Sequence, residues 1–261
     1  MAYDRTLIQV RERNFLDILD LSLVVIRRWP GRLGLAAVSG ICPFALFNLW
    51  FFRAYPELSN VWWIPLLILE SPWATALLTI VLGGLLFGER PRPSRVANRF
   101  LSALPTMLLN QLLVRGSLLT TFLFLPLLPA RLAFLNEVIL LERTTGFRPL
   151  RRCYKLCASR EGDLLGRSVA LLFFSVAFIV CFTMGTGILT SVVIRGEPTW
   201  YEDRQGAGLL DPRVQFSLWF SIAFSAVVRF LTYVDQRIRL EGWAVELTLR
   251  DAGHALEKSL S

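Results

Sequence analysis

Long apolar blocks bracketed by arginine dominate this sequence, and they leave the chain few ways to fold. Several blocks run for about 18 or more residues with hardly a charge, which is the length that a helix needs to cross a hydrocarbon core of about 30 Å. No run alternates apolar and polar residues over about ten positions, so membrane-spanning strands are not expected. Charged residues make up only 18% of the chain, whereas a soluble domain has roughly 25%. The sequence therefore predicts an all-α, polytopic membrane helical bundle.

The stretch 116–167 is the most informative part of the sequence about the membrane topology. An almost unbroken apolar run from Ser117 to Leu128 leads to the acids Glu137 and Glu142, and a basic segment at 148–156 follows. This order is typical of a membrane span that emerges at the cytoplasmic face.

We predict about six transmembrane helices within a domain at 33–236. Segment 100–114 is short for a full span, so a tilted or re-entrant helix is the alternative there. The six predicted spans are 33–52, 66–87, 100–114, 117–141, 169–194 and 216–233.

Two flanking segments complete the predicted organisation. Residues 1–32 place apolar side chains on one helical face, which indicates an amphipathic helix lying in the membrane interface or packing against the bundle. Residues 237–261 read as a short, charged, cytoplasmic C-terminal helix.

The distribution of lysine and arginine predicts the orientation. Segments 1–32, 88–99 and 143–167 hold six, four and seven of these residues, whereas 54–60 holds none and 195–213 holds three beside four acids. Because basic loops stay inside, both termini are expected in the cytoplasm.

Several function classes lack their sequence signatures. The chain has no nucleophile-elbow, zinc-protease, phosphate-loop or dinucleotide motif, and it has a single histidine, His254. We therefore expect no enzyme, no cofactor and no metal site. The net charge of +8 comes from residues that flank apolar blocks, so it favours anionic lipid headgroups over nucleic acid. Cys153 and Cys157 share a helical face but are too few for a metal centre.

Four charged residues within or beside spans are candidate functional groups. Glu70 and Arg115 are expected toward the outer side, where they could pair, with Arg53 as the alternative partner of Glu70. Glu137 and Arg229 are expected toward the inner side and predicted to pair with each other. Intramembrane charges mark either a substrate or proton path or an interhelical ion pair.

The elbow after the fourth predicted span is a second candidate site. Its side chains either pair with one another or bind anionic lipid headgroups or a partner protein. The residues concerned are Glu142, Arg143, Arg151 and Arg152.

The elbow also resembles a known bacterial pattern. Two segments carry the resemblance, namely 137–143 and then 150–156, which includes Arg152 and Leu156. This pattern is similar to the membrane domain attached to some glycerophosphoryl diester phosphodiesterases. Cys153 stands where that group has serine. The tail 233–242 also looks like the end of such proteins. The resemblance implies a six-helix domain in a bacterial inner membrane. It does not imply phosphodiesterase activity, because that activity belongs to a separate soluble domain.

Two functions remain open from the sequence. One is a non-enzymatic scaffold or accessory subunit of a bacterial envelope system, with membrane lipids and other envelope proteins as partners. The other is a small transporter or lipid-handling protein that uses the intramembrane charges.

Overall fold

The protein is built from helices throughout the part that the computed structural model describes, which is residues 14–55, 57, 59–86, 92–120, 131–142, 144–158, 160–195 and 211–260. The predicted all-α class is therefore confirmed. The helices are α1 (Phe15–Arg28), α2 (Pro30–Ala54), α3 (Ser59–Leu86), α4 (Pro93–Thr120), α6 (Leu135–Glu142), α7 (Arg148–Ala158), α8 (Glu161–Arg195) and α9 (Pro212–Leu260).

Four of the described helices are long and apolar enough to cross a membrane. These candidate spans are Pro30–Ala54, Trp62–Leu86, Glu161–Val193 and Pro212–Leu240. They contain the predicted spans 33–52 and 216–233 in full, and 66–87 and 169–194 apart from the last residue of each. The prediction of six spans is not confirmed, and most of the predicted span 117–141 lies outside the described residues.

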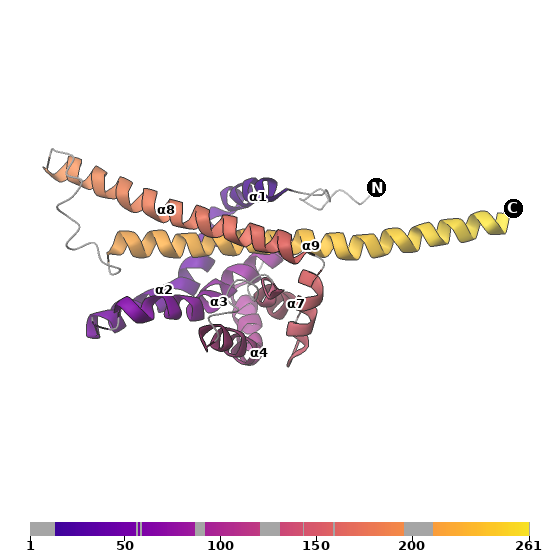
Figure 1. Ribbon diagram of the computed structural model, residues 1–261, viewed down its shortest axis with the longest axis horizontal. Helices are drawn as coiled ribbons and strands as arrows, with labels where there is room; N and C mark the ends of the chain where they lie inside the picture. Colours follow the sequence, from indigo (N-terminus) through magenta and orange to yellow (C-terminus); the bar gives the residue numbers. More distant parts are fainter. Residues whose placement is uncertain are drawn as a thin grey trace.

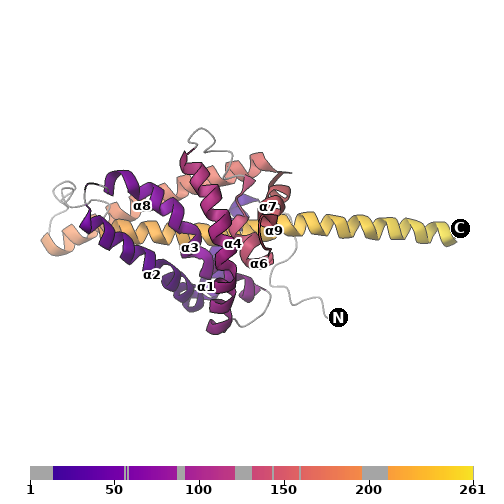
Figure 2. The same ribbon diagram turned by 90° about the horizontal axis from the view of Figure 1, so that it is seen from below.

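Helix α4 accounts for part of the difference between the six predicted spans and the four candidate spans. It covers the predicted segment 100–114, but it carries the amides Asn110 and Gln111 as well as three arginines, and it is not among the candidate spans. Figure 2 shows α4 running across the direction of α8 and α9, and Figure 1 shows it nearly end-on. Helix α7 also runs across α9 in Figure 1. Helices α4 and α7, with α6 in contact with both, form a layer against the long helices, which we call the transverse layer.

Helix α1 packs on the bundle. Its N-cap residue Asn14 donates a backbone hydrogen bond to the carboxylate of Asp17 at 3.3 Å, which satisfies a donor that a helix start leaves free. Ile18 and Val25 are buried in a cluster shared with α2, α3 and α9, whereas Leu16 stays exposed. The predicted amphipathic helix is therefore present from residue 15, with one face against the bundle.

Helices α2 and α3 approach each other closely at Gly40. A Cβ atom there would collide with the carbonyl oxygen of Ala74. Small residues permit this kind of contact between membrane helices, where van der Waals packing is the main attraction.

Helix α8 lies along α9 and leaves most of its surface uncovered. The aromatic pairs Phe178–Phe220 and Phe182–Phe216, with ring centroids 5.3 and 5.4 Å apart, join the two helices, which run side by side in both views (Figures 1 and 2). The outer face exposes side chains such as Phe173, which is 71% exposed. An apolar helix with so little protein cover is suited to hydrocarbon.

Helix α9 differs from the prediction at its C-terminal end. It runs without a break from Pro212 to Leu260, so residues 237–260 continue the candidate span instead of forming a separate tail helix. No proline follows Pro212 in this helix, and Gly242 and Gly253 alone do not stop it. In Figure 1 the C-terminal part projects well beyond the other helices.

Substitution of Gly40 tests the α2–α3 contact. We expect Gly40→Ala to destabilise the bundle by about 1–3 kcal/mol, as overpacking does, because the new methyl group meets the backbone of Ala74. Gly34→Ala is the matched control, since a Cβ at Gly34 on the same helix has nothing within 4 Å. Thermal unfolding in mild detergent measures both variants. Equal melting temperatures would contradict the close approach.

Candidate functional site: a buried polar network

Three of the four charged residues singled out in the sequence come together between α3, α4, α6 and α9. Arg115 lies on α4, Glu137 on α6 and Arg229 on α9. The fourth, Glu70, lies on α3 and has a different partner.

Glu137 and Arg229 form the predicted ion pair. The Nε of Arg229 donates to Oε1 of Glu137 at 2.7 Å. The Glu137 side chain is fully buried and that of Arg229 is 28% exposed. Charge-assisted hydrogen bonds of this length are strong, so this contact ties α6 firmly to α9. Two further buried atoms, Oε2 of Glu137 and Nη2 of Arg229, have no hydrogen-bond partner within the described part of the chain.

Arg115 is held by neutral acceptors and not by an acid. Its Nε donates to Oε1 of Gln111 at 3.1 Å, and its Nη1 donates to Oγ of Ser71 at 3.1 Å. Gln111 in turn donates to Oδ1 of Asn136 at 3.5 Å, and the amide of Asn136 donates to the carbonyl oxygen of Pro72 at 3.1 Å. These bonds link α3, α4 and α6.

One of the two prolines within α3, Pro72, leaves a backbone acceptor free. Pro72 has no N–H, so the carbonyl of Ile68 one turn earlier loses its usual partner. The hydroxyl of Ser71 donates to that carbonyl oxygen at 3.4 Å. The hydroxyl of Ser71 thus replaces the hydrogen bond that the Ile68 carbonyl loses to proline. Polar side chains from α4 and α6 surround this part of α3.

Glu70 pairs with an amide, and the predicted partners were wrong. The Nδ2 of Asn48 on α2 donates to Oε2 of Glu70 at 2.7 Å, and Glu70 is only 6% exposed. Arg115 bonds to Ser71 instead, and Arg53 is exposed near the end of α2. Asn48 was missed because the prediction sought opposite charges, although it is the one amide in the first predicted span.

The elbow between α6 and α7 is closed by its own side chains. Glu142 accepts from Nε of Arg152 at 3.1 Å and from the hydroxyl of Tyr233 on α9 at 2.9 Å. Arg151 is exposed on α7, and Arg143 lies outside the described residues. Of the two alternatives for Glu142 and Arg152, the structure shows the internal pair.

A glycine and an amide set the turn before α7. Gly146 has a φ of 68°, which suits glycine because it lacks a Cβ. The carbonyl oxygen of Gly146 accepts from Nδ2 of Asn110 on α4 at 2.9 Å. The turn is therefore fastened to the transverse layer.

Cys153 and Cys157 lie buried on the same face of α7. Cys153 donates to the carbonyl oxygen of Arg131 at 3.7 Å. Hydrogen bonding with Cys157, together with burial, raises the pKa of the Cys153 thiol, so this side chain stays protonated. No group of three or more histidine, cysteine or acidic side chains suited to a metal ion occurs among the described residues.

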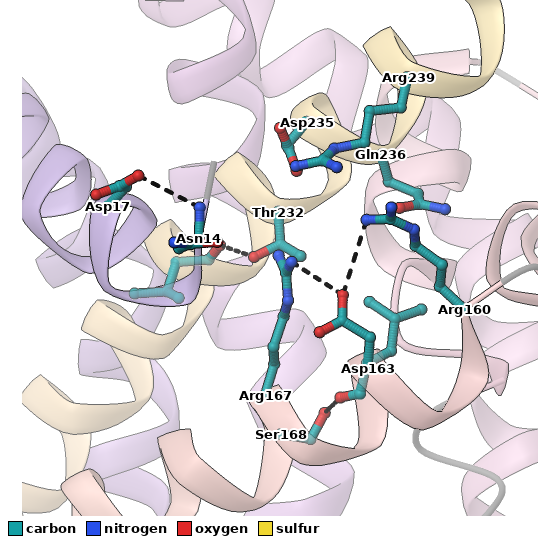
Figure 3. Close-up of polar contacts among 12 residues, drawn as sticks. Asn14, Asp17, Arg160, Asp163, Arg167, Ser168, Thr232, Asp235, Gln236 and Arg239 are labelled. Carbon is teal, nitrogen blue, oxygen red and sulfur yellow. Dashed lines mark hydrogen bonds and ion pairs between the residues drawn. The ribbon is translucent and has the colours of Figure 1, made fainter. Parts of the chain in front are cut away.

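A surface cluster near the start of α8 was not foreseen from the sequence. Asp163 lies between Arg160 and Arg167, at 4.0 and 2.9 Å (Figure 3). Asp235 and Arg239 form a second pair at 3.0 Å on the neighbouring stretch of α9. Their spacings of three and four residues give one helical face, a signal that could have been read in advance.

Comparisons with known proteins add no family to this geometry. No protein-family model, curated protein or solved structure matches the chain.

Substitutions at 137 and 229 test the central ion pair. We expect Glu137→Gln and Arg229→Gln each to cost about 3–5 kcal/mol, because each leaves a buried charge without its partner. Exchanging the two residues, Glu137→Arg with Arg229→Glu, should recover part of that loss. Asp163→Asn serves as the control, because an exposed pair contributes about 0–1 kcal/mol and Asp163 is 47% exposed.

Unfolding in detergent measures all four variants. An exchange variant no more stable than the single variants would count against the pair.

Proposed function

We propose that the protein is a non-enzymatic integral membrane module that acts as a scaffold or accessory subunit of a bacterial envelope system. The observation that carries the proposal is the continuous helix α9, which runs through the bundle and then projects to Leu260 (Figure 1). A single helix that links a membrane bundle to a projecting end can present a binding surface at a fixed distance from the membrane.

The bonding of the interior charges supports a structural role. Arg229, Asn48 and Tyr233 each bond to an acid on another helix. Catalytic groups need to face a pocket where a substrate can approach, whereas these side chains hold helices together. The same pairs would keep α6 and α9 aligned under the projecting part of α9.

The proposed topology has four spans with both termini in the cytoplasm of a bacterial cell and the bundle in its inner membrane. With spans at α2, α3, α8 and α9, the basic segments 1–32, 88–99 and 143–167 all fall on one side. This satisfies the preference of lysine and arginine for the cytoplasmic side. Helix α7 then lies at that face, where anionic headgroups would meet its exposed Arg151.

Reporter fusions test this topology. Fusions after residue 261 and before residue 1 should both report a cytoplasmic location, as should an insertion at 144–145 between α6 and α7. An insertion at 205 between α8 and α9 should report the opposite side. Reporters that place the two termini on opposite sides would exclude four spans.

Truncation tests the role of α9. Ending the chain after Leu240 should leave membrane insertion and bundle stability unchanged, because the helix beyond that point projects past the other helices (Figure 1). Envelope proteins that co-purify with the full chain in mild detergent should be lost. Gly242→Pro should have the same effect by breaking the helix, whereas Gly242→Ala, its matched control, should not.

Retention of every co-purified protein by the truncated chain would contradict the scaffold proposal.

A small lipid-handling protein or transporter is the second candidate. It is favoured by one observation, namely that a second arginine, Arg115, joins the network beside the Glu137–Arg229 pair through Gln111 and Asn136. A structural ion pair does not require a second arginine at this place.

A further inference from the structure

The charges around the buried network do not balance. Two guanidinium groups, from Arg115 and Arg229, belong to one network: Arg115 is linked through Gln111 to Asn136, and the residue after Asn136 pairs with Arg229. Glu137 pairs with Arg229, and the hydrogen bonds of Arg115 go to the neutral side chains of Gln111 and Ser71. Among the described residues the cluster therefore carries one uncompensated positive charge.

An uncompensated charge at this position is costly. Burying a charge in an apolar interior without a counter-charge is unfavourable, and a second like charge in the same network adds to that cost. Hydrogen bonds to neutral groups orient Arg115 but do not cancel its charge. An anion beside both arginines would remove the repulsion and the charge together.

The site has both free bonding capacity and access. The Nη2 atom of Arg229 is buried without a hydrogen-bond partner in the described structure. The network is not sealed, because the Arg229 side chain is 28% exposed and Arg115 is partly exposed.

The surface cluster of Figure 3 differs in this respect. In it, Asp163 pairs with two arginines; Arg160 and Asp163 are 40% and 47% exposed, and Arg167 is 13% exposed. Water and dissolved salt compensate charges at such positions. Arg160 and Arg167 both contact Asp163 directly, whereas Arg115 bonds to neutral side chains.

We infer that Arg115 and Arg229 together bind a singly charged oxyanion of the phosphodiester type, held between α3, α4, α6 and α9. Guanidinium groups match such oxygens in charge and in planar, two-point hydrogen bonding. A membrane phospholipid and inorganic phosphate both supply phosphate oxygens, so the experiment separates these two sources. The inference goes beyond the scaffold proposal and does not depend on it, since a scaffold can hold a lipid as a structural component.

The test uses the full chain, purified in a neutral detergent and washed free of loosely bound lipid. Melting temperature is measured with added phosphatidylglycerol, with diacylglycerol of the same acyl chains, and with inorganic phosphate against chloride at equal ionic strength. Tightly retained phosphorus is measured on the same samples. The variants are Arg115→Gln and the matched control Arg95→Gln, because Arg95 is exposed on the same helix.

We expect phosphatidylglycerol to raise the melting temperature of the native protein and of Arg95→Gln, and diacylglycerol to leave it unchanged. Arg115→Gln should lose the shift and the retained phosphorus. If inorganic phosphate alone gives the Arg115-dependent shift, the oxyanion site stands and its source is soluble. A shift that persists in Arg115→Gln, or no shift and no retained phosphorus in the native protein, would overturn the inference.

A second pair of variants covers the case in which Arg115→Gln does not fold. Arg115→Lys keeps the positive charge but loses the two-point geometry, so it should retain less phosphorus than Arg95→Lys. Equal retention in these two variants would also overturn the inference.

Discussion

Hydrocarbon offers no hydrogen bonds, so each polar group inside a membrane bundle must find its partner within the protein. This constraint accounts for the main contacts between the helices. Asn48 bonds to Glu70, Arg229 to Glu137 and Asn136 to the Pro72 carbonyl. The same constraint acts within single helices. Thr183, Thr186 and Thr190 on α8 return their hydroxyl bonds to carbonyls of their own helix, which lets this helix stand largely uncovered.

The transverse layer depends on the same requirement. Helix α4 carries an arginine and two amides in a part of the chain that is otherwise apolar, and the partners of these side chains lie on α3, α6 and the turn at Gly146. Lying across the long helices lets α4 offer polar groups to several elements at once. Its outward face remains apolar, with Leu108 and Leu112 exposed. Polar contacts thus fix where the layer sits, and apolar contacts fill the space between.

The sequence predicted the helical class and the four long apolar helices, because their length and composition are local properties. It also predicted the pair Glu137–Arg229, since opposite charges on apolar helices have few other partners. It failed on Glu70, because a neutral amide can satisfy a carboxyl group as well as an arginine can, and no local signal marks which one lies nearby. It did not anticipate the transverse course of α4 or the continuity of α9, because both depend on packing between distant segments.

The length of α9 has a mechanical consequence. Residues 241–260 add about 30 Å of helix, at 1.5 Å per residue, beyond the last residue of the candidate span. A helix without a joint moves as a stiff rod, so a slight tilt of its membrane portion sweeps the far tip through a much larger arc. Changes in bilayer thickness, which alter helix tilt, would therefore be magnified at the end of the chain as lateral displacement.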